Sequence, residues 1–429
     1  MTKKRVLVVF PTAWDERQLA ALPAEVRALY ELHLDQPRDE DVRWDLDVLG
    51  YIDARAHAWR GRLDGVTSSS DYPGAIAAAA IAEALGLPGA GARNVLCAGH
   101  KYYSRLAQRT AAPEAVPGFA LFDPADERSW PARFPCFVKP VKGSFSLFAR
   151  RIDDRAALHA FTRSSALAEF RAHHVRLFDE LCARYAPFEH GARAFLAEEL
   201  LGGAQATVEG WIDGQGPHVL GVVDTLFHPG STSFAGFHYP SLLPASVQER
   251  MGRIACDVAR TLGLGPTLFN AEFFHDARDR VSLIEINPRP CGQFADLYEK
   301  VDGTNGFELV LALASGRVPT ARRRAGTFAA AASIPLRVFR TTRLRRVPER
   351  AHQEEIERRF PGTLVWSDCQ SGELLRVASD VEDGQSVRYG VINLGGASRS
   401  DIQEKSAVIA RELAFDLATM DAPSTDVSA

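Results

Sequence analysis

The alternation of apolar and polar residues predicts that strands and helices alternate from the start of the chain. An apolar run at residues 5–10 predicts a buried strand, and residues 15–30 have the periodicity of a helix. Residues 64–74 resemble a strand that runs into a loop, and the Ala-rich residues 75–85 predict a helix that ends at Gly86. This order of elements indicates a βαβ layer with a parallel sheet.

Further along, the pattern changes to one of paired strands. Residues 153–185 predict two helical stretches, and residues 204–224 predict two strands joined by an Asp-Gly-Gln-Gly turn. Residues 225–244 are rich in Gly, Ser and Pro with interspersed aromatic residues, and we expect a long ordered loop that faces the substrate. Residues 400–417 predict a helix, which ends a small α+β unit and precedes a frayed tail.

Residues 268–274 and 281–287 flank a charged turn and predict an antiparallel hairpin. Glu272 should lie almost opposite Glu285, with Asn287 on the same face, whereas Ile284 and Ile286 should point into a core. Two carboxylates that face each other repel, so the pair indicates that a cation binds between them. Carboxylate and amide oxygens are ligands that suit Mg²⁺.

Arg289 follows this hairpin and provides a fixed positive group for a phosphate or an oxyanion. With Glu272, Glu285 and Asn287 it resembles the metal and phosphate signature of the ATP-grasp superfamily. The resemblance extends over four segments in the family order, from about residue 64 to residue 319. It implies ATP as the nucleotide and two Mg²⁺ ions, which Mn²⁺ could replace, with Arg289 and Lys139 as catalytic residues.

The same resemblance implies two lysines that bind the nucleotide. Lys139 ends a short apolar run, and the loop that follows it contains Gly143, Ser144 and Ser146 and would close over the triphosphate. Lys101 begins an amphipathic helix and matches the other nucleotide lysine. The loop has fewer glycines than is usual in the family, but its backbone N–H groups can still bind phosphate.

Residues 194–203 resemble the adenine hinge of the family. Glu198 would accept the exocyclic amine of adenine, and the backbone of Glu199, Leu200 and Leu201 would pair with the ring edge. Gln205 stands where many relatives have a glutamate that binds the ribose, and it can still accept one hydrogen bond. His238, Tyr239, Gly292 and Gln293 are our candidates for contacts with the substrates.

The composition argues against several other kinds of protein. The 429 residues are 46% hydrophobic and 24% charged with a net charge of −4, which favours a soluble enzyme without nucleic-acid or membrane partners. Nine arginines between residues 322 and 350 show no interleaved aromatic platform or recognition helix, and we interpret them as solvated loops or as a positive flank that attracts ATP. No apolar run approaches the roughly 20 residues of a membrane span. Six cysteines without metal-site spacing favour a reduced, cytoplasmic setting.

We therefore expect α/β and α+β domains: a Rossmann-like pre-ATP-grasp domain (1–95), an ATP-grasp domain (96–320, with a lid at about 130–200), a C-terminal α+β domain (321–420) and a flexible tail (421–429). The resemblance implies an ADP-forming carboxylate–amine ligase, similar to L-amino-acid ligases, that acts through an acylphosphate on a small carboxylate and an amine. A homodimer is compatible with this interpretation. The alternatives are a biotin-carboxylase-like or carbamoyl-phosphate-like enzyme, and an ATP-binding regulatory protein without turnover. The absence of a biotin-carrier or glutamine-amidotransferase segment in this sequence argues against the first of them.

Overall fold

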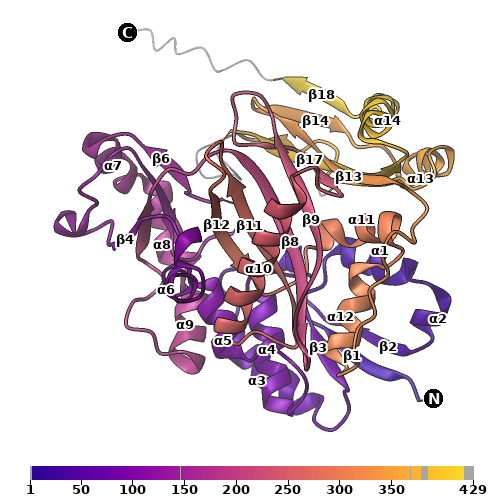
Figure 1. The fold of residues 1–429 in the computed structure, drawn as a ribbon, viewed down its shortest axis with the longest axis horizontal. Coiled ribbons are helices and arrows are strands. Elements are labelled where there is room, and N and C mark those ends of the chain that lie inside the picture. The colour runs from indigo at the N-terminus through magenta and orange to yellow at the C-terminus, as the bar shows by residue number, and fades with distance from the viewer. Residues whose placement is uncertain (1, 145, 368, 378–384, 420–429) are drawn as a thin grey trace.

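The computed structural model describes residues 2–144, 146–367, 369–377 and 385–419. In this part of the chain a large antiparallel sheet occupies the centre, with the N-terminal parallel sheet on one side and the helices α7 and α8 on the other (Figure 1). No helix among these residues has both the length and the apolar character that a membrane span requires.

The N-terminal region contains the predicted parallel sheet. Strand β1 pairs in parallel with both β2 and β3, which gives the order β2-β1-β3. Gly86 ends α4 as predicted, in the left-handed conformation (φ 65°) that glycine adopts readily. The elements are β1 (Lys4–Val8), α1 (Ala13–Ala21), α2 (Ala24–Arg27), β2 (Tyr30–Leu34), the short 3-10 helix η1 (Asp39–Asp41), α3 (Val48–Ala58), β3 (Gly65–Thr67), α4 (Gly74–Leu85) and α5 (Ala92–Gly99).

The helix predicted for residues 15–30 is wrong in its extent. Two short helices, α1 and α2, replace it, and Leu22 between them has extended dihedral angles (φ −54°, ψ 148°). Pro23 causes the break, because it lacks an N–H donor and excludes the helical conformation from the residue before it. The chain then enters β2 at Tyr30.

The segment that we predicted as a lid, together with the strand that precedes it, contains among its described residues a four-stranded antiparallel sheet and three helices. Its strand order is β4-β7-β5-β6. The two helical stretches predicted for residues 153–185 are three helices, because the hydroxyl of Ser164 caps a new helix by accepting from the backbone N–H of Leu167. The elements, with those that precede them, are α6 (Lys101–Ala111), η2 (Pro113–Ala115), β4 (Phe119–Phe122), η3 (Glu127–Ser129), β5 (Cys136–Pro140), β6 (Arg150–Ile152), α7 (Arg155–Thr162), α8 (Ser165–His173), α9 (Arg176–Tyr185) and β7 (Phe195–Glu198).

The central sheet has the order β12-β11-β8-β9-β10-β13-β17-β15, and all of its neighbouring strands are antiparallel. The hairpin predicted for residues 204–224 is present as β8 and β9. The sheet continues across residue 320, where we expected a domain boundary. Its strands are β8 (Ala204–Asp213), β9 (Gly216–Phe227), β10 (Phe234–Tyr239), β11 (Thr267–His275), β12 (Val281–Asn287), β13 (Ala330–Val338), β15 (Leu364–Trp366) and β17 (Val387–Gly396).

The period of two along β11 separates a core face from a polar face. Phe269 and Phe273 are fully buried and belong to the same hydrophobic cluster as Met251 of helix α10 (Ala245–Thr261). Asn270 and Glu272 alternate with them and therefore project from the opposite face. Helix α10 thus packs on one face of the sheet, and Asn270 and Glu272 project from the other face (Figure 1).

The hairpin β11–β12 has the predicted register at its functional end. Glu272 lies directly opposite Glu285, and Ile286 is buried in the core as expected. The prediction for Ile284 is wrong, because a β-bulge shifts the register between Glu272 and Phe273. The extra residue reverses the alternation, so Leu283 takes the core position and Ile284 is half-buried.

Residues 225–244 do not form the long loop that we predicted. Strand β9 continues to Phe227, and β10 pairs with both β9 and β13. Alternating aromatic side chains explain the strand, since Phe237 packs on Phe294 with ring centroids 5.1 Å apart. The high content of Gly, Ser and Pro was therefore a misleading loop signal in this segment.

The C-terminal region adds helices and a small sheet of order β16-β14-β18. The helix predicted for residues 400–417 ends at Glu412, and after a left-handed residue, Ala414 (φ 50°), the chain forms β18. The predicted tail at residues 421–429 lies outside the described residues. The elements are η4 (Gly292–Phe294), α11 (Ala295–Asp302), α12 (Gly306–Ala314), β14 (Thr342–Arg346), α13 (Arg350–Arg359), β16 (Leu374–Leu375), α14 (Arg399–Glu412) and β18 (Asp416–Thr419).

Candidate active site

A cavity of about 150 Å³ lies between the hairpin β11–β12, the start of α6 and the loop after β5. Its walls carry charged side chains from four segments that are distant in the sequence. The structure thus brings together most of the residues predicted for the nucleotide and the metal. Those that line the cavity are Lys101, Lys139, Ser144, Ser146, Glu272, Glu285, Asn287 and Arg289.

The two facing carboxylates of the hairpin carry different charges. Burial, and then repulsion from Glu285, raises the pKa of Glu272 to about 8. Burial would also raise the pKa of Glu285, but the ammonium groups of Lys101 and Lys139 outweigh it and lower that pKa. The amide of Asn287 donates to Glu285 Oε1 at 3.4 Å. The positive charge around the hairpin therefore favours ionised Glu285 but does not suffice for Glu272.

A divalent cation would remove this deficit. Glu272, Glu285 and Asn287 offer oxygen atoms, which are the donors that Mg²⁺ prefers, and together they would hold part of its shell. The described residues contain no group of three or more His, Cys, Asp or Glu side chains that could hold a metal. Nucleotide phosphates and water would thus complete the shell, and bound Mg²⁺ would neutralise triphosphate charge.

The two lysines reach the cavity from different elements. Lys101 begins α6, and its ammonium donates to the Gly143 carbonyl at 2.9 Å and lies 3.3 Å from Glu285 Oε2. Lys139, near the end of β5, lies 2.8 Å from Glu198 Oε2 and 3.4 Å from the Ile284 carbonyl. Burial lowers the pKa of Lys139.

Asp71 is a residue of this cavity that the sequence reasoning missed. Its Oδ1 accepts from Arg289 Nε at 3.3 Å, and its Oδ2 accepts from Lys142 at 3.2 Å and from the Ser144 hydroxyl at 2.6 Å. Burial opposes ionisation, but Lys142 and Arg289 outweigh it and hold the pKa of Asp71 well below its usual range. The available signal was its position just after β3, because ligands bind at the carboxyl ends of parallel strands.

Arg105 is a second residue that was missed. It lies on α6, is 1% exposed and bonds to both carboxylate oxygens of Glu198. It also donates to the carbonyls of Leu283 and Ile284 at the bulge of β12. The sequence carries little signal for it, because an arginine in an amphipathic helix is usually exposed.

The Glu198 side chain already has partners within the protein. Both of its oxygens accept hydrogen bonds from cations, so an adenine amine would have to share the carboxylate with them. Burial opposes ionisation, but Lys139 and Arg105 lower the pKa of Glu198 to about 2. In the protein without a ligand Glu198 thus belongs to a buried ion network, and its contact with adenine stays a prediction.

The other hinge residues lie beside the cavity and are not among the residues that line it. Glu199 is exposed, and its backbone N–H donates to the Gly118 carbonyl at 2.8 Å. Leu200 and Leu201 are half-buried in the segment between β7 and β8. Gln205 Nε2 donates to Glu272 Oε2 at 3.2 Å, so Gln205 contacts one of the predicted metal ligands. The adenine and ribose roles remain predictions.

His238 and Tyr239, the substrate candidates on β10, are also absent from the described lining of the cavity. Burial, and then repulsion from Arg399, lowers the pKa of His238 to about 4. The Tyr239 hydroxyl donates to Asp302, and its ring packs on that of Tyr298 with centroids 4.8 Å apart. In the protein without a ligand, both side chains are therefore buried among other residues of the protein.

Gly292 and Gln293 follow Arg289 in the turn that leads to α11. The Gly292 carbonyl accepts from the indole N–H of Trp14 at 2.9 Å, and Gln293 donates to the Ser333 hydroxyl at 2.7 Å. The turn therefore joins the N-terminal region to the central sheet. Neither residue lines the cavity, whereas Phe234 of β10, which was not among our candidates for substrate contacts, does.

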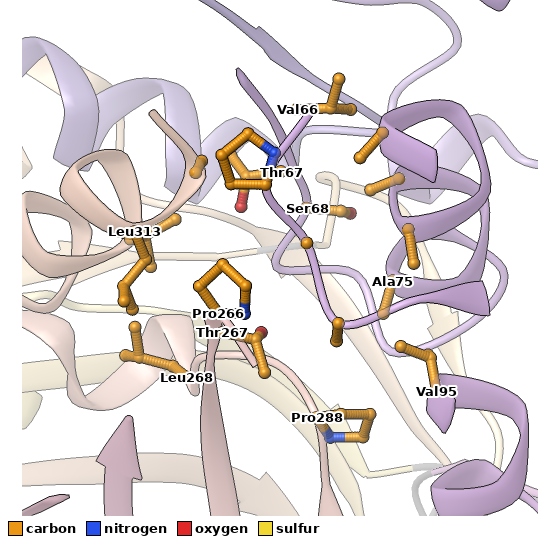
Figure 2. Close-up of a pocket in the computed structure, with 18 of the residues that line it drawn as sticks. Val66, Thr67, Ser68, Ala75, Val95, Pro266, Thr267, Leu268, Pro288 and Leu313 are labelled. Atoms are coloured by element: carbon orange, nitrogen blue, oxygen red, sulfur yellow. The ribbon is translucent and has the colours of Figure 1, made fainter. Parts of the chain in front are cut away.

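A second cavity, of about 50 Å³, lies between β3, α4, α12, the start of β11 and the segment that follows β12. Figure 2 shows Val66 of the N-terminal sheet on one side, with Pro266 and Pro288 of the central sheet region on another. Pro288 and Pro290 line it and flank Arg289 in the sequence. The described lining contains no charged side chain, so we place the chemistry in the larger cavity.

Comparison with known families agrees with this geometry. Residues 132–297 match the family model described as ATP-grasp domain. The chain contains an ATP-grasp domain. The matched segment includes Lys139, Glu272, Glu285, Asn287 and Arg289, and it begins after Lys101. No curated protein matches the sequence.

Solved structures show that the ATP-grasp fold extends over nearly the whole chain. An L-amino acid ligase from Bacillus licheniformis superposes with a TM-score of 0.73 at 16% identity, covering 99% of this chain and 100% of that one. A phosphoribosylglycinamide synthetase from Anaerococcus prevotii reaches 0.63 at 13% identity, with coverages of 98% and 100%. The biotin carboxylase domain of the Hydrogenobacter thermophilus 2-oxoglutarate carboxylase, in complex with MgADP and bicarbonate, reaches 0.66 at 13%, with coverages of 98% and 92%.

Proposed function

We propose that this protein is an ATP-dependent carboxylate–amine ligase. In the first step a substrate carboxylate attacks the γ-phosphorus of ATP, which forms an acylphosphate and releases ADP. In the second step an amine attacks the acyl carbon, the bond to the phosphate breaks, and an amide, inorganic phosphate and a proton are formed. We infer that amino acids are the substrates and that two Mg²⁺ ions assist the phosphoryl transfer.

The observation that carries the proposal is the convergence of lysines, facing carboxylates and Arg289 in one cavity. Lys101 and Lys139 would bind the phosphates, and Glu272 and Glu285 would hold the cations that neutralise charge during in-line transfer. Arg289 would stabilise the acylphosphate and the oxyanion of amine attack. Each group has a distinct task in the same reaction.

The preference for an amine rests on the similarity to the L-amino acid ligase, which has a higher TM-score than the biotin carboxylase domain. Magnesium is supported by the oxygen donors of the hairpin and by the MgADP that the biotin carboxylase domain binds. All six cysteines are free, in keeping with the cytoplasmic setting that we infer.

A matrix of amino acids and small carboxylates, incubated with Mg-ATP, tests the proposal. ADP and phosphate release would be measured for each pair, and the amide product would be identified by mass spectrometry. We expect ADP release that requires both an acid and an amine. ADP release that depends on bicarbonate alone would support a carboxylase-like reaction, and ATP binding without ADP release in any well would support a regulatory protein.

A further inference from the structure

The guanidinium of Arg105 has all of its hydrogen-bond acceptors within the protein. It is buried on α6, and each of its five N–H groups has an acceptor. The acceptors are Glu198 Oε1 at 2.7 Å and Oε2 at 3.2 Å, the carbonyls of Leu283 and Ile284 at 2.8 Å each, and the side-chain oxygen of Gln108. This arrangement holds the guanidinium in one orientation.

Glu198 connects Arg105 to the nucleotide lysine. Its Oε2 accepts from Arg105 and also lies 2.8 Å from the ammonium of Lys139. The Glu198 side chain is 4% exposed and that of Lys139 is 6% exposed, so solvent screens neither charge well. Two cations thus share one carboxylate, so Arg105, Glu198 and Lys139 together have a net charge of +1 at the wall of the cavity, and Glu285 also attracts the Lys139 ammonium.

We propose that Arg105 is a positioning residue that keeps the charge of Lys139 available to the nucleotide phosphates by sharing Glu198 with it. The inference deepens the proposed function and rests on it, because it assumes that Lys139 binds phosphate. Arg105 lines the cavity, but its N–H groups all have acceptors within the protein, so we do not expect it to bind the phosphates directly. It acts through Glu198, and through the two carbonyls next to the bulge from which Glu285 projects.

The sign of the effect follows from charge balance. Without Arg105, Lys139 and Glu198 form a neutral buried ion pair, and an incoming phosphate must compete with Glu198 for the ammonium. If Glu198 is then neutralised as well, the ammonium loses its ion-pair partner at 2.8 Å, and its charge becomes available to the phosphate again. The loss caused by the first change is therefore reversed by the second.

A double-mutant cycle tests this reversal. The proteins are the full-length wild type, Arg105→Gln, Glu198→Gln and the double variant, and the probe is a non-hydrolysable ATP analogue with Mg²⁺ in calorimetry. Melting temperatures are recorded in parallel, because a purely structural role would make the double variant at least as unstable and as weakly binding as Arg105→Gln.

We expect Arg105→Gln to weaken binding by about tenfold or more, the scale of a buried charge left with an altered partner. The double variant should return to within about threefold of the wild type, since coupled neighbours are not additive. A double variant that binds as weakly as Arg105→Gln would overturn the proposal. A wild type that binds no nucleotide would instead refute the proposed function.

Two further variants complete the test. Arg105→Lys keeps the charge but not the five-donor fork, so its affinity should fall less than that of Arg105→Gln. It provides the test if Arg105→Gln does not fold, and a tenfold loss in this variant would overturn the proposal, because the charge on which the proposal rests is retained. Arg109→Gln, one turn along α6 on its exposed side, is the matched control. Its affinity should equal that of the wild type, because Arg109 stacks on Phe119 outside the cavity.

Discussion

Replacing Glu272 by glutamine should stabilise the metal-free protein at alkaline pH and abolish its response to Mg²⁺. Glu272 lies directly opposite Glu285 on the hairpin, so two carboxylates compete for the positive charge of the same cavity. Glutamine keeps the size of the side chain and an oxygen that can accept from Gln205, which now donates to Glu272 at 3.2 Å. The substitution therefore removes the charge and little else.

The magnitude follows from the pKa of Glu272, which is raised from 4.5 to about 8. The folded protein binds this proton more tightly than the unfolded chain does, so the ionised form destabilises the fold. The penalty is absent below about pH 4.5, grows as the pH rises to about 8 and is complete above that pH. It corresponds to roughly 5 kcal/mol. With an unfolding entropy of about 0.9 kcal/mol/K for 429 residues, the Tm should rise by about 5 °C.

The assay is thermal unfolding of the wild type and of Glu272→Gln at pH 5 and pH 9, each with a chelator and with Mg²⁺. With the chelator, the variant should melt several degrees above the wild type at pH 9 and close to it at pH 5. Mg²⁺ should raise the Tm of the wild type at pH 9 and leave that of the variant unchanged. The control is Glu249→Gln on the exposed side of α10, whose effect should be equal at both pH values.

Two results would refute this reasoning. If the variant and the wild type have the same Tm at pH 9 with the chelator, the facing carboxylates do not repel as the register implies. If Mg²⁺ stabilises the variant as much as the wild type, the cation binds elsewhere. Either result would remove the main argument for a metal between β11 and β12.

Three substitutions test the proposed chemistry directly. Glu285→Gln should reduce phosphate release below about a tenth of the wild-type level while the protein remains folded, because metal-centred charge stabilisation is worth several kcal/mol; higher activity would speak against this ligand. Lys139→Ala should weaken both ATP binding and turnover, since it removes a charge from the phosphates in the ground state and in the transition state; an unchanged affinity in calorimetry would exclude the contact. Arg289→Lys should nearly preserve ATP affinity but lower amide formation on the order of 10²-fold, the scale of one lost oxyanion donor. For this variant ADP and amide are quantified together, and wild-type levels of both would make Arg289 a structural residue.

The sequence was sufficient for those parts of the site that lie close together along the chain. Glu272, Glu285 and Asn287 sit on one hairpin, and the period of two in a strand together with a short turn determines which side chains face each other. Lys139 was found through the resemblance to the ATP-grasp superfamily, which implied a lysine at the end of the short apolar run that forms β5. Local patterns of this kind depend on backbone geometry that each segment carries by itself.

Two local predictions failed because neighbouring strands changed the outcome. Ile284 left the core because a bulge in β12 added one residue opposite β11. Residues 234–239 became a strand because β9 and β13 were available to pair with them on both sides. In each case a hydrogen-bonding partner from elsewhere in the chain overrode the local propensity.

The charge network of the cavity depended on the tertiary structure alone. Asp71 meets Arg289 across a separation of 218 residues, and Arg105 meets Glu198 across one of 93. Neither side chain has a pattern in its own segment that distinguishes it from a solvated residue. The roles of Asp71 and Arg105 arise only when packing excludes water, because a buried charge needs an opposite charge or a hydrogen-bonding partner. The sequence thus determined which groups are available for the chemistry, and the packing of distant segments decided which of them share their charges.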